Sequence, residues 1–330
     1  MPQCARTVNP NPRLCSTRTS GVAVAALAVL AIAGCAPRTT SPADSRPVIR
    51  LVADPSTSQA LALAYSQSLP GIRVQLVQTM GTGATVTALQ RGDADLGFVL
   101  ADVAYFANLS LGEHHDTSLE PLRGIAALQT APVHLLTRRG LVIQQVSDLR
   151  GLDVRMNAAF ASQALLAQLV FNAYGLDLAN LRRRPLIADL IVRAGNLDGD
   201  AAFVTGYYPA NAVRTATRLG AQLMPIDGPI LEHLRREYPF VRSVSIPANT
   251  YEGQHASVKT IGVDRLLVCR ADLDQRLAHD LTQQFLNALP AVFGSVRTSP
   301  RLLDLDQMAA TPIPLHKGAA QYYRERELTP

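Results

Sequence analysis

The sequence predicts an α/β protein whose folded part consists of two similarly built lobes. Short apolar strands alternate with helical stretches from residue 48 onward, which favours a parallel sheet with helices on its faces. The pattern at residues 91–99 (RGDADLGFV) returns at residues 198–204 (DGDAAFV), and each copy places a glycine before a short strand. The chain has 330 residues, which suffices for one large domain or two of ordinary size.

The first half of the folded part has the order β-α-β-α-β. Residues 48–53 (VIRLVA) form an apolar strand that ends where Asp54 opens a segment rich in helix-capping side chains. The next predicted elements are a helix over 58–69, an alternating strand over 72–78, a short helix from about Ala84 to Arg91, and an apolar strand over 96–100.

The second half repeats this order. A turn at 147–151 precedes a strand over 152–156, a Leu- and Ala-rich helix covers 162–174, and a short strand covers 201–204. Closer to the C-terminus, an apolar residue recurs every four positions within 272–292, which predicts a long amphipathic helix packed on the core; these residues are Leu273, Leu277, Leu281, Phe285 and Leu289.

The N-terminus carries an export signal. Residues 1–20 are polar with a positive bias, and residues 21–33 (GVAVAALAVLAIA) form an apolar core that is too short to span a membrane. The following tetrad, Ile32–Cys35, resembles a bacterial lipobox, which implies cleavage after residue 34 and a lipid on Cys35. The alternative is an ordinary secretory signal with a chance cysteine. We therefore predict a signal peptide over 1–34 and a lipidated Pro/Ser/Thr-rich tether over 35–47.

Composition excludes several classes of protein. The chain is 48% hydrophobic and 17% charged, so it can build a packed core. It has no tryptophan and 5% aromatic residues, which argues against base stacking on nucleic acid, and the net charge of +5 comes with no basic block. Cys4 and Cys15 leave with the signal, so Cys269 alone stays in the folded body, where we expect a buried free thiol and no disulfide.

Candidate binding residues follow the predicted strands. In an open α/β sheet, ligands bind beyond the C-terminal ends of strands, close to helix N-termini. Four segments qualify, and their hydroxyl and amide groups suit hydrogen bonding to a small anion. The predicted ligand-binding residues are Ser56, Thr57, Ser58, Gly81, Thr82, Thr85, Ser162, Gln163, Tyr207 and Tyr208. Helix capping and turn formation are the alternative explanation for each of them.

Motifs for other chemistry are weak or absent. Residues 81–86 (GTGATV) imitate a dinucleotide fingerprint, but Val86 stands at the third glycine position. The segment His114–Asp116 lacks the spacing of a metal site and reads as a polar loop. The sequence contains no GxSxG, HExxH or Walker A motif. We therefore expect no enzyme activity, no catalytic residue, no cofactor and no metal.

The chain resembles the TAXI family, the solute-binding subunits of TRAP transporters, over roughly residues 48–325. The resemblance is strongest in residues 246–254 (IPANTYEGQ), 259–263 (KTIGV) and 266–268 (LLV), and in the closing segment 312–325 (PIPLHKGAAQYYRE). Residues 148–151 (DLRG) and 92–97 (GDADLG) also match.

The resemblance implies a periplasmic-binding-protein type II fold, with two lobes that close a cleft on a small organic anion. Crossover strands near 133–137 and 261–268 would join the lobes, so that 48–132 plus 265–330 form lobe 1 and 133–262 forms lobe 2. By position, Thr82 and Thr85 replace a serine and an asparagine of the family, while Tyr207 and Tyr208 lie in the lobe 2 loop that faces the cleft. The expected ligand is an amino or keto acid.

The function expected from the resemblance is capture of this anion for TRAP membrane subunits in the periplasm. Ala36 after Cys35 favours the outer membrane, and the lipid is the only expected membrane contact. The loops at 54–58 and 160–163 depart from the family's glycine-rich loops, so a lipoprotein sensor or scaffold without a transport role is a second hypothesis. An enzyme on the same two-lobed frame is a third, which the missing acid–base cluster disfavours.

We predict that Cys35→Ser releases the protein from membranes, because the cysteine sulfur is the expected point of lipid attachment. Membrane fractionation and labelling with a fatty acid analogue measure the effect, with Cys15→Ser as the control. A Cys35→Ser protein that still sediments with membranes and takes up the label would contradict the prediction.

Overall fold

The computed structural model describes residues 45–54, 57–114, 119–156, 161–177, 181–185, 192–193, 196–294 and 307–326. Residues 46–330 form one compact unit. The predicted signal peptide, Cys35 and most of the tether lie outside the described residues, as do Ser56, His115 and Asp116. None of the described helices is long and apolar enough to cross a membrane.

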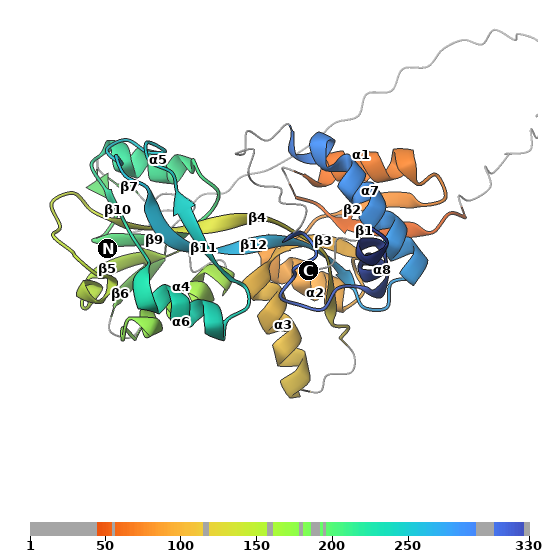
Figure 1. The fold of residues 1–330 in the computed structure, drawn as a ribbon, viewed down its shortest axis with the longest axis horizontal. Coiled ribbons are helices and arrows are strands. Elements are labelled where there is room, and N and C mark those ends of the chain that lie inside the picture. Colours follow the sequence, from red (N-terminus) through yellow and green to blue (C-terminus); the bar gives the residue numbers. More distant parts are fainter. Residues whose placement is uncertain are drawn as a thin grey trace, which may run out of the picture. The chain divides into compact units, whose positions relative to one another are not determined.

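The described elements follow the α/β order that the sequence predicts (Figure 1). The helices are α1 (Ser58–Ser68), α2 (Gly81–Gln90), α3 (Ala101–His114), α4 (Ala161–Ala173), α5 (Asn211–Arg218), α6 (Gly228–Glu237), α7 (Gln275–Phe293) and α8 (Lys317–Glu325), with a short 3-10 helix at Val146–Leu149. The strands are β1 (Val48–Val52), β2 (Arg73–Val77), β3 (Leu96–Leu100), β4 (Leu122–Thr137), β5 (Asp153–Met156), β6 (Arg182–Pro185), β7 (Val192–Arg193), β8 (Asn196–Leu197), β9 (Ala201–Thr205), β10 (Gln222–Met224), β11 (Val241–Ile246) and β12 (Val258–Arg270).

Two parallel three-stranded units are joined by two long antiparallel strands. In lobe 1, β1 lies between β2 and β3 and is parallel to both. In lobe 2, β5 lies between β6 and β9, again in parallel. Strands β4 and β12 run between these units, and the strand order is β2-β1-β3-β12-β4-β9-β5-β6. The predicted fold class, two α/β lobes joined by crossover strands, is confirmed.

The crossover strands change partners along their length. Strand β4 pairs with β12 up to Pro132 and with β9 from Val133 onward. Strand β12 pairs with β11 over 258–263 and with β3 over 265–269. The lobe boundaries themselves stay a prediction.

Helices cover both faces of the lobe 1 sheet. Leu61 and Tyr65 of α1 pack with Phe285 of α7 and with Tyr323 of α8 in one buried cluster. The predicted long helix is therefore confirmed as α7, which begins after Asp274, whose carboxylate accepts a hydrogen bond from the Leu277 N–H at 2.8 Å. Helices α2 and α3 contribute to a second cluster that continues into lobe 2.

Two predicted boundaries are wrong, and four described helices, α3, α5, α6 and α8, were not predicted. Helix α2 begins at Gly81 rather than near Ala84, because a positive φ of 84° at Gly81 turns the chain directly into the helix. Strand β4 extends from Leu122, well before the predicted 133–137. Helix α3 follows β3 with no glycine or proline between them to mark its start. Cys269 is a buried free thiol, as predicted.

The sequence echo corresponds to a structural repeat with a shifted alignment. Asp95 immediately precedes β3, and its main-chain N–H donates to the Arg50 carbonyl while its Oδ2 accepts from the Arg50 N–H, both at 2.8 Å. Asp200 immediately precedes β9 and makes the same two bonds with Asp153, at 2.8 and 3.0 Å. The lobe 1 counterpart of Asp200 is therefore Asp95, although the sequence alignment matched Asp93.

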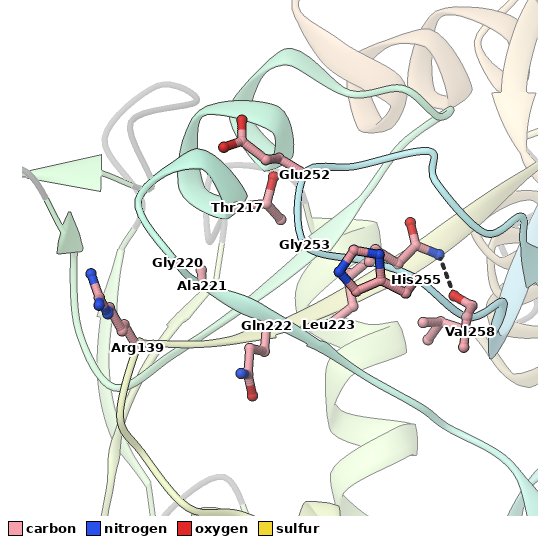
Figure 2. Close-up of a pocket in the computed structure, with 12 residues that line it drawn as sticks. Arg139, Thr217, Gly220, Ala221, Gln222, Leu223, Glu252, Gly253, His255 and Val258 are labelled. Carbon is pink, nitrogen blue, oxygen red and sulfur yellow. Dashed lines mark hydrogen bonds between the residues drawn. The ribbon is translucent and has the colours of Figure 1, made fainter.

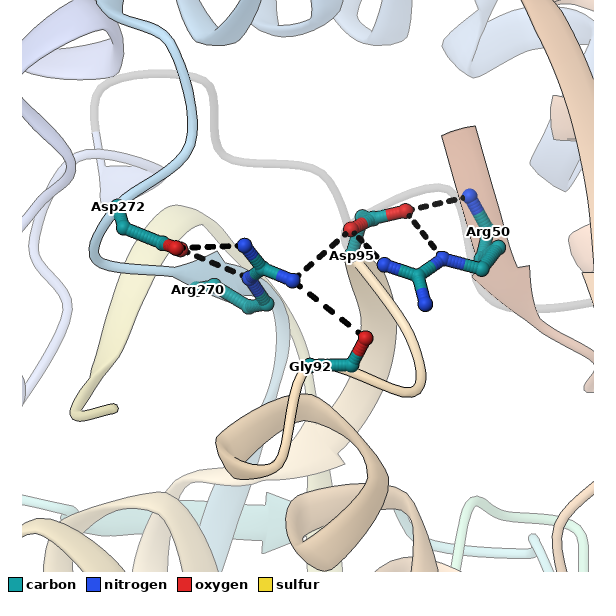
Figure 3. Close-up of polar contacts among 5 residues, drawn as sticks. All are labelled: Arg50, Gly92, Asp95, Arg270 and Asp272. Atoms are coloured by element: carbon teal, nitrogen blue, oxygen red, sulfur yellow. Dashed lines mark hydrogen bonds and ion pairs between the residues drawn. The ribbon is translucent and has the colours of Figure 1, made fainter. Parts of the chain in front are cut away.

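Asp95 also anchors charged side chains at this end of the sheet (Figure 3). Its two carboxylate oxygens accept from Arg50 Nη2 at 2.7 Å and from Arg50 Nε at 3.0 Å. Arg270 approaches the same carboxylate at 3.5 Å and forms a closer pair with Asp272. The carboxylate is buried, so its removal leaves the Arg50 guanidinium without its ion-pair partner.

We predict that Asp95→Ala lowers the free energy of unfolding by about 2–4 kcal/mol, because Arg50 loses both side-chain and main-chain hydrogen bonds. Asp93→Ala is the matched control, since Asp93 is exposed two residues away, and it should change stability by under about 0.5 kcal/mol. Urea denaturation followed by circular dichroism measures both. Equal effects of the two substitutions would contradict the assignment of Asp95 as the repeated carboxylate.

Candidate functional site

A charged and polar cluster lies where the lobe 1 strands end and the crossover strands pass. Its centre is Arg265 of β12, which pairs with Leu100 at the end of β3. The loop that follows β1 contributes Asp54 and Thr57. The loop that follows β9 contributes Tyr207 from lobe 2. The two loops, and the end of β3 that pairs with Arg265, belong to the edge of the sheet at which the sequence predicted a binding site.

Arg265 is buried, and its guanidinium is held on three sides. Nη2 lies 3.0 Å from Asp54 Oδ1 and donates to Thr57 Oγ1 at 2.9 Å. The guanidinium carbon lies 4.3 Å from the ring centre of Phe98, a cation–π contact. A buried arginine held in this way presents its remaining N–H groups in a fixed direction, which suits a carboxylate or another oxyanion.

The loop after β1 is closed by its own side chains. Asp54 Oδ1 accepts from the main-chain N–H and from the hydroxyl of Thr57, at 3.1 and 2.8 Å. The Ser58 hydroxyl donates to the Val52 carbonyl at 2.8 Å and accepts from the Asp54 N–H at 2.8 Å. Thr57 therefore reaches Arg265, whereas the Ser58 hydroxyl shapes the loop.

Tyr207 brings a buried hydroxyl to this cluster from the other lobe. Burial raises the pKa of Tyr207 to about 12, with the Arg265 charge acting in the opposite direction and the carboxylates of Asp54 and Asp264 adding to the rise. The phenol is therefore uncharged at neutral pH. Its Oη makes no hydrogen bond of ordinary geometry among the described residues, but it lies close enough to the Arg265 guanidinium for that group to lower its pKa. A buried hydroxyl without a partner is uncommon and fits a group that a ligand would satisfy.

Asp264, the neighbour of Arg265, is held in a network of its own. Its Oδ1 accepts from the Thr130 hydroxyl of β4 at 2.6 Å, and its Oδ2 accepts from Arg242 Nε of β11 at 2.7 Å. This network ties β4, β11 and β12 together beside the cluster. Both carboxylates near Tyr207 therefore have an arginine partner, so the cluster carries little net charge.

Two further buried polar atoms without a described partner belong to residues close to Arg265 in the strand register. Asp102 Oδ1 follows the end of β3, and Gln129 Oε1 lies on β4. Between the pairs Ala127–Leu266 and Thr130–Asp264, β4 has one extra residue, so the main chain of Gln129 lies in the bulge opposite Arg265. Burial raises the pKa of Asp102 to about 7, with hydrogen bonds from main-chain N–H groups opposing the rise.

The start of α2 holds the predicted residues Gly81, Thr82 and Thr85. The Thr85 hydroxyl is buried and lies 2.9 Å from Thr79 Oγ1 and 3.2 Å from the Gly81 carbonyl, so neighbouring groups already satisfy it. Thr82 is partly exposed in the first turn. The structure gives no side-chain bond between this helix start and Arg265.

Among the ten predicted ligand-binding residues, the structure brings Thr57 and Tyr207 into the Arg265 cluster. Tyr208 packs on an apolar cluster of lobe 2. Ser162 and Gln163 lie in the first turn of α4, but their side chains are outside the described part, as is Ser56. A binding role for the ten stays a prediction. Arg265, Asp102 and Gln129 were missed, and Asp54 lay in the candidate segment 54–58 without being named as a ligand-binding residue. Two adjacent charges inside an apolar run (VDRLLV) were a signal that could have found Asp264 and Arg265.

A separate open cavity of about 470 Å³ lies on lobe 2, and none of the residues that line it belongs to the Arg265 cluster (Figure 2). It is bounded by Arg139, by the end of α5 and β10, and by residues 252–256. A smaller neighbouring cavity of about 340 Å³ includes Arg214 and Arg218. Among the described residues, no group of three or more His, Cys, Asp or Glu side chains could hold a metal ion.

Comparison with known proteins identifies the type of fold. A model of the NMT1-like family matches residues 57–326. The chain is similar to PhnD1 from Prochlorococcus marinus in complex with methylphosphonate, at 14% identity and a TM-score of 0.51, over 86% of this chain and 99% of that one. It is also similar to a putative periplasmic sulfonate-binding protein of an ABC transporter from Methylobacillus flagellatus, at 14% identity and a TM-score of 0.50, over 86% and 88%.

A third similar structure is XAC2383 from Xanthomonas citri bound to ATP, at 14% identity and a TM-score of 0.50, over 84% of this chain and 94% of that one. Together these likenesses show the two-lobed fold of type II periplasmic binding proteins.

We predict that the stability of the protein falls as the pH rises from about 4 to 7 through the titration of Asp102. The folded-state pKa of about 7 lies above the ordinary value of 3.8, so the native state binds more protons than the unfolded state in this window. Asp102→Asn lacks this contribution and should gain on the order of 1–4 kcal/mol over the wild type between pH 4 and pH 8. Urea denaturation at several pH values measures the difference, and parallel curves for the two proteins would contradict the prediction.

Proposed function

This chain belongs to the NMT1-like family, and we propose on that premise that it is an extracytoplasmic solute-binding protein that captures a small organic anion for a membrane transporter. The observation that carries the proposal is the buried guanidinium of Arg265, which is oriented by Asp54, Thr57 and Phe98 and faces an unsatisfied Tyr207 hydroxyl. Lobe 1 supplies the cation and lobe 2 supplies the phenol, so closure of the lobes would bring both onto one ligand.

Arg265 is the arginine that we assign to the ligand's anionic group. Its Nη2 already contacts Asp54 and Thr57, so the remaining N–H groups of the fork are the ones that a carboxylate would take. Tyr207 Oη would donate to the same group, since its raised pKa keeps the proton in place at neutral pH. The N-terminus of α2, with Gly81 and Thr82, would add a favourable dipole worth about 0.3–1 kcal/mol when exposed.

The ligand we favour is an amino acid, because the cluster offers acceptors as well as donors. Gln129 Oε1 can only accept a hydrogen bond and has no described partner. Asp54 and Arg265 neutralise each other, so a ligand that brings both an ammonium and a carboxylate would leave no net charge buried. A keto acid would satisfy the arginine but would leave the Gln129 acceptor without a donor.

The relatives in fold suggest a second ligand chemistry for the same arginine. PhnD1 from Prochlorococcus marinus is in complex with methylphosphonate, and the Methylobacillus protein is named as sulfonate-binding. Phosphonates and sulfonates are oxyanions that a guanidinium also binds. They therefore belong in the ligand screen beside carboxylates.

Delivery to TRAP membrane subunits is the transport role that the resemblance to the TAXI family implies. The lipobox at Ile32–Cys35 would hold the protein on a membrane facing the periplasm, and Ala36 favours the outer one. Co-purification of the mature protein with TRAP membrane subunits, compared with an ABC permease, would test the class of transporter.

The first experiment is a thermal-shift screen of the mature protein against amino acids, keto acids, dicarboxylates, methylphosphonate and alkanesulfonates. A ligand that binds the folded state alone raises the melting temperature. A shift with amino acids and none with the matching keto acids would support the proposal. No shift with any of these anions would favour the sensor or scaffold hypothesis.

We predict that Tyr207→Phe weakens binding of the ligand found in the screen by roughly tenfold, because one hydrogen bond to a charged group is lost. The melting temperature without ligand should stay unchanged, since the hydroxyl has no described partner to lose. Arg265→Lys keeps the charge but loses the planar fork, so a reduction of roughly a hundredfold is expected. Isothermal titration calorimetry measures both, with Tyr238→Phe on the α6 end as the control.

Unchanged affinity in both Tyr207→Phe and Arg265→Lys would contradict the assignment of the site. A loss in Arg265→Lys that came with a lower melting temperature would be uninformative by itself, so Tyr207→Phe decides the question.

A further inference from the structure

The segment 246–254, which is the most distinctive part of the sequence, forms a structured loop between β11 and β12. Gln254 is its internal support, since its Nε2 donates to the carbonyls of Ile246, Pro247 and Ala256 at 2.9–3.2 Å. Its Oε1 accepts from the Tyr251 N–H at 3.2 Å. The Gln254 side chain thus links the main chain at both ends of the loop and bonds directly to the main chain of Tyr251.

Tyr251 points from this loop into lobe 2, where only 4% of it is exposed. Its Oη accepts a hydrogen bond from the Ala210 main-chain N–H at 3.0 Å. The same Oη lies 2.9 Å from His134 Nε2 on β4, and the two rings meet edge to face. The phenol thus joins three segments that are far apart in the sequence.

The protonation states of its members limit the direction of this hydrogen-bond chain. Burial lowers the pKa of His134 to about 4, so the imidazole is neutral, and burial raises the pKa of Tyr251 to about 12, so the phenol keeps its proton. The Tyr251 hydroxyl accepts from Ala210, and it can donate its own proton to His134 Nε2 in the tautomer that carries the imidazole hydrogen on Nδ1. Both hydrogen bonds are buried, and a buried donor or acceptor that loses its partner lowers the stability of the folded state.

Ala210 closes the segment that carries Tyr207. It is the residue before α5, three positions after Tyr207. The other end of the segment is fixed by Gly206, whose N–H donates to the Pro132 carbonyl of β4 at 3.1 Å. Tyr207 therefore lies between two main-chain anchors, one on the crossover strand and one on the Tyr251 hydroxyl.

We propose that Tyr251 is a positioning residue for the candidate binding site, and that its hydroxyl holds the 206–210 segment so that Tyr207 faces Arg265. The assignment of Tyr207 to a ligand rests on the proposed function, but the effect of Tyr251 on Tyr207 does not. Tyr251 touches no ligand in this scheme and acts through Ala210. The distinctive loop at 246–254 thereby acts on the site through the segment 206–210.

The absence of tryptophan from the chain allows a direct test without any ligand. Tyr207→Trp places the chain's only tryptophan in the segment, and acrylamide quenching of its selectively excited fluorescence reports its exposure. Adding Tyr251→Phe, which keeps the ring and removes only the hydroxyl, should raise the quenching constant by about twofold and move the emission to longer wavelength. Thr250→Val is the matched control, because Thr250 bonds only within the loop, to the Pro247 carbonyl.

Hydrogen–deuterium exchange of the protein with Tyr207 intact provides a second readout. Tyr251→Phe should speed exchange of peptides that cover residues 206–212, while peptides of lobe 1 stay unchanged. Unaltered quenching together with unaltered exchange would overturn the proposal. A general loss of protection with a lower melting temperature would also overturn it, because Tyr251 would then support the fold as a whole.

The outcome is separate from that of the ligand screen. If no anion shifts the melting temperature while Tyr251→Phe frees residue 207, the proposed function fails and the positioning role stands. If a ligand is found and Tyr251→Phe leaves residue 207 unmoved, the positioning role fails alone.

Discussion

The antiparallel pair of β4 and β12 is the interaction on which the rest of the structure depends. The sheet of each lobe includes a part of β4 or β12. Strand β4 changes its pairing partner near Pro132, and strand β12 changes its partner near Asp264. Gly262 makes the crossing possible, since a Cβ there would lie 2.7 Å from Thr130 Cγ2 and 2.9 Å from the Ala131 carbonyl oxygen. If the lobes move, as the proposed function requires, these continuous strands would keep both sheets paired during the motion.

The same crossing concentrates the polar groups of the candidate site. Asp264 and Arg265 are neighbours on β12, and the bulge in β4 brings Gln129 opposite Arg265. Charged side chains at such a buried place need partners, which Arg242 and Asp54 supply. The Arg265 cluster therefore differs from the ion pairs around Asp95. Both bury arginine–aspartate pairs, but the Arg265 cluster also contains polar atoms of Gln129 and Tyr207 that have no described hydrogen-bond partner.

The repeat explains why two lobes of different sequence share one construction. In each lobe an aspartate directly before the third parallel strand closes two main-chain bonds with the central strand. The strand that follows then ends at the crossing, so the start of α3 after β3 and the loop after β9 both lie at the candidate site. Asp102 and Tyr207 owe their places to this shared geometry, one from each lobe, although nothing in their local sequences links them.

The sequence by itself determined the α/β order, the long helix α7, the buried Cys269 and the edge of the sheet where the candidate site lies, because periodicity and turn residues act locally. It also singled out Thr57 and Tyr207. The length of β4, the start of α2 and the pairing of Asp95 with Arg50 depended on contacts between distant segments, which no local pattern records. Arg265 became recognisable only when folding placed it against Asp54 and Thr57, more than 200 residues earlier in the chain, since burial and partners distinguish a binding arginine from the others.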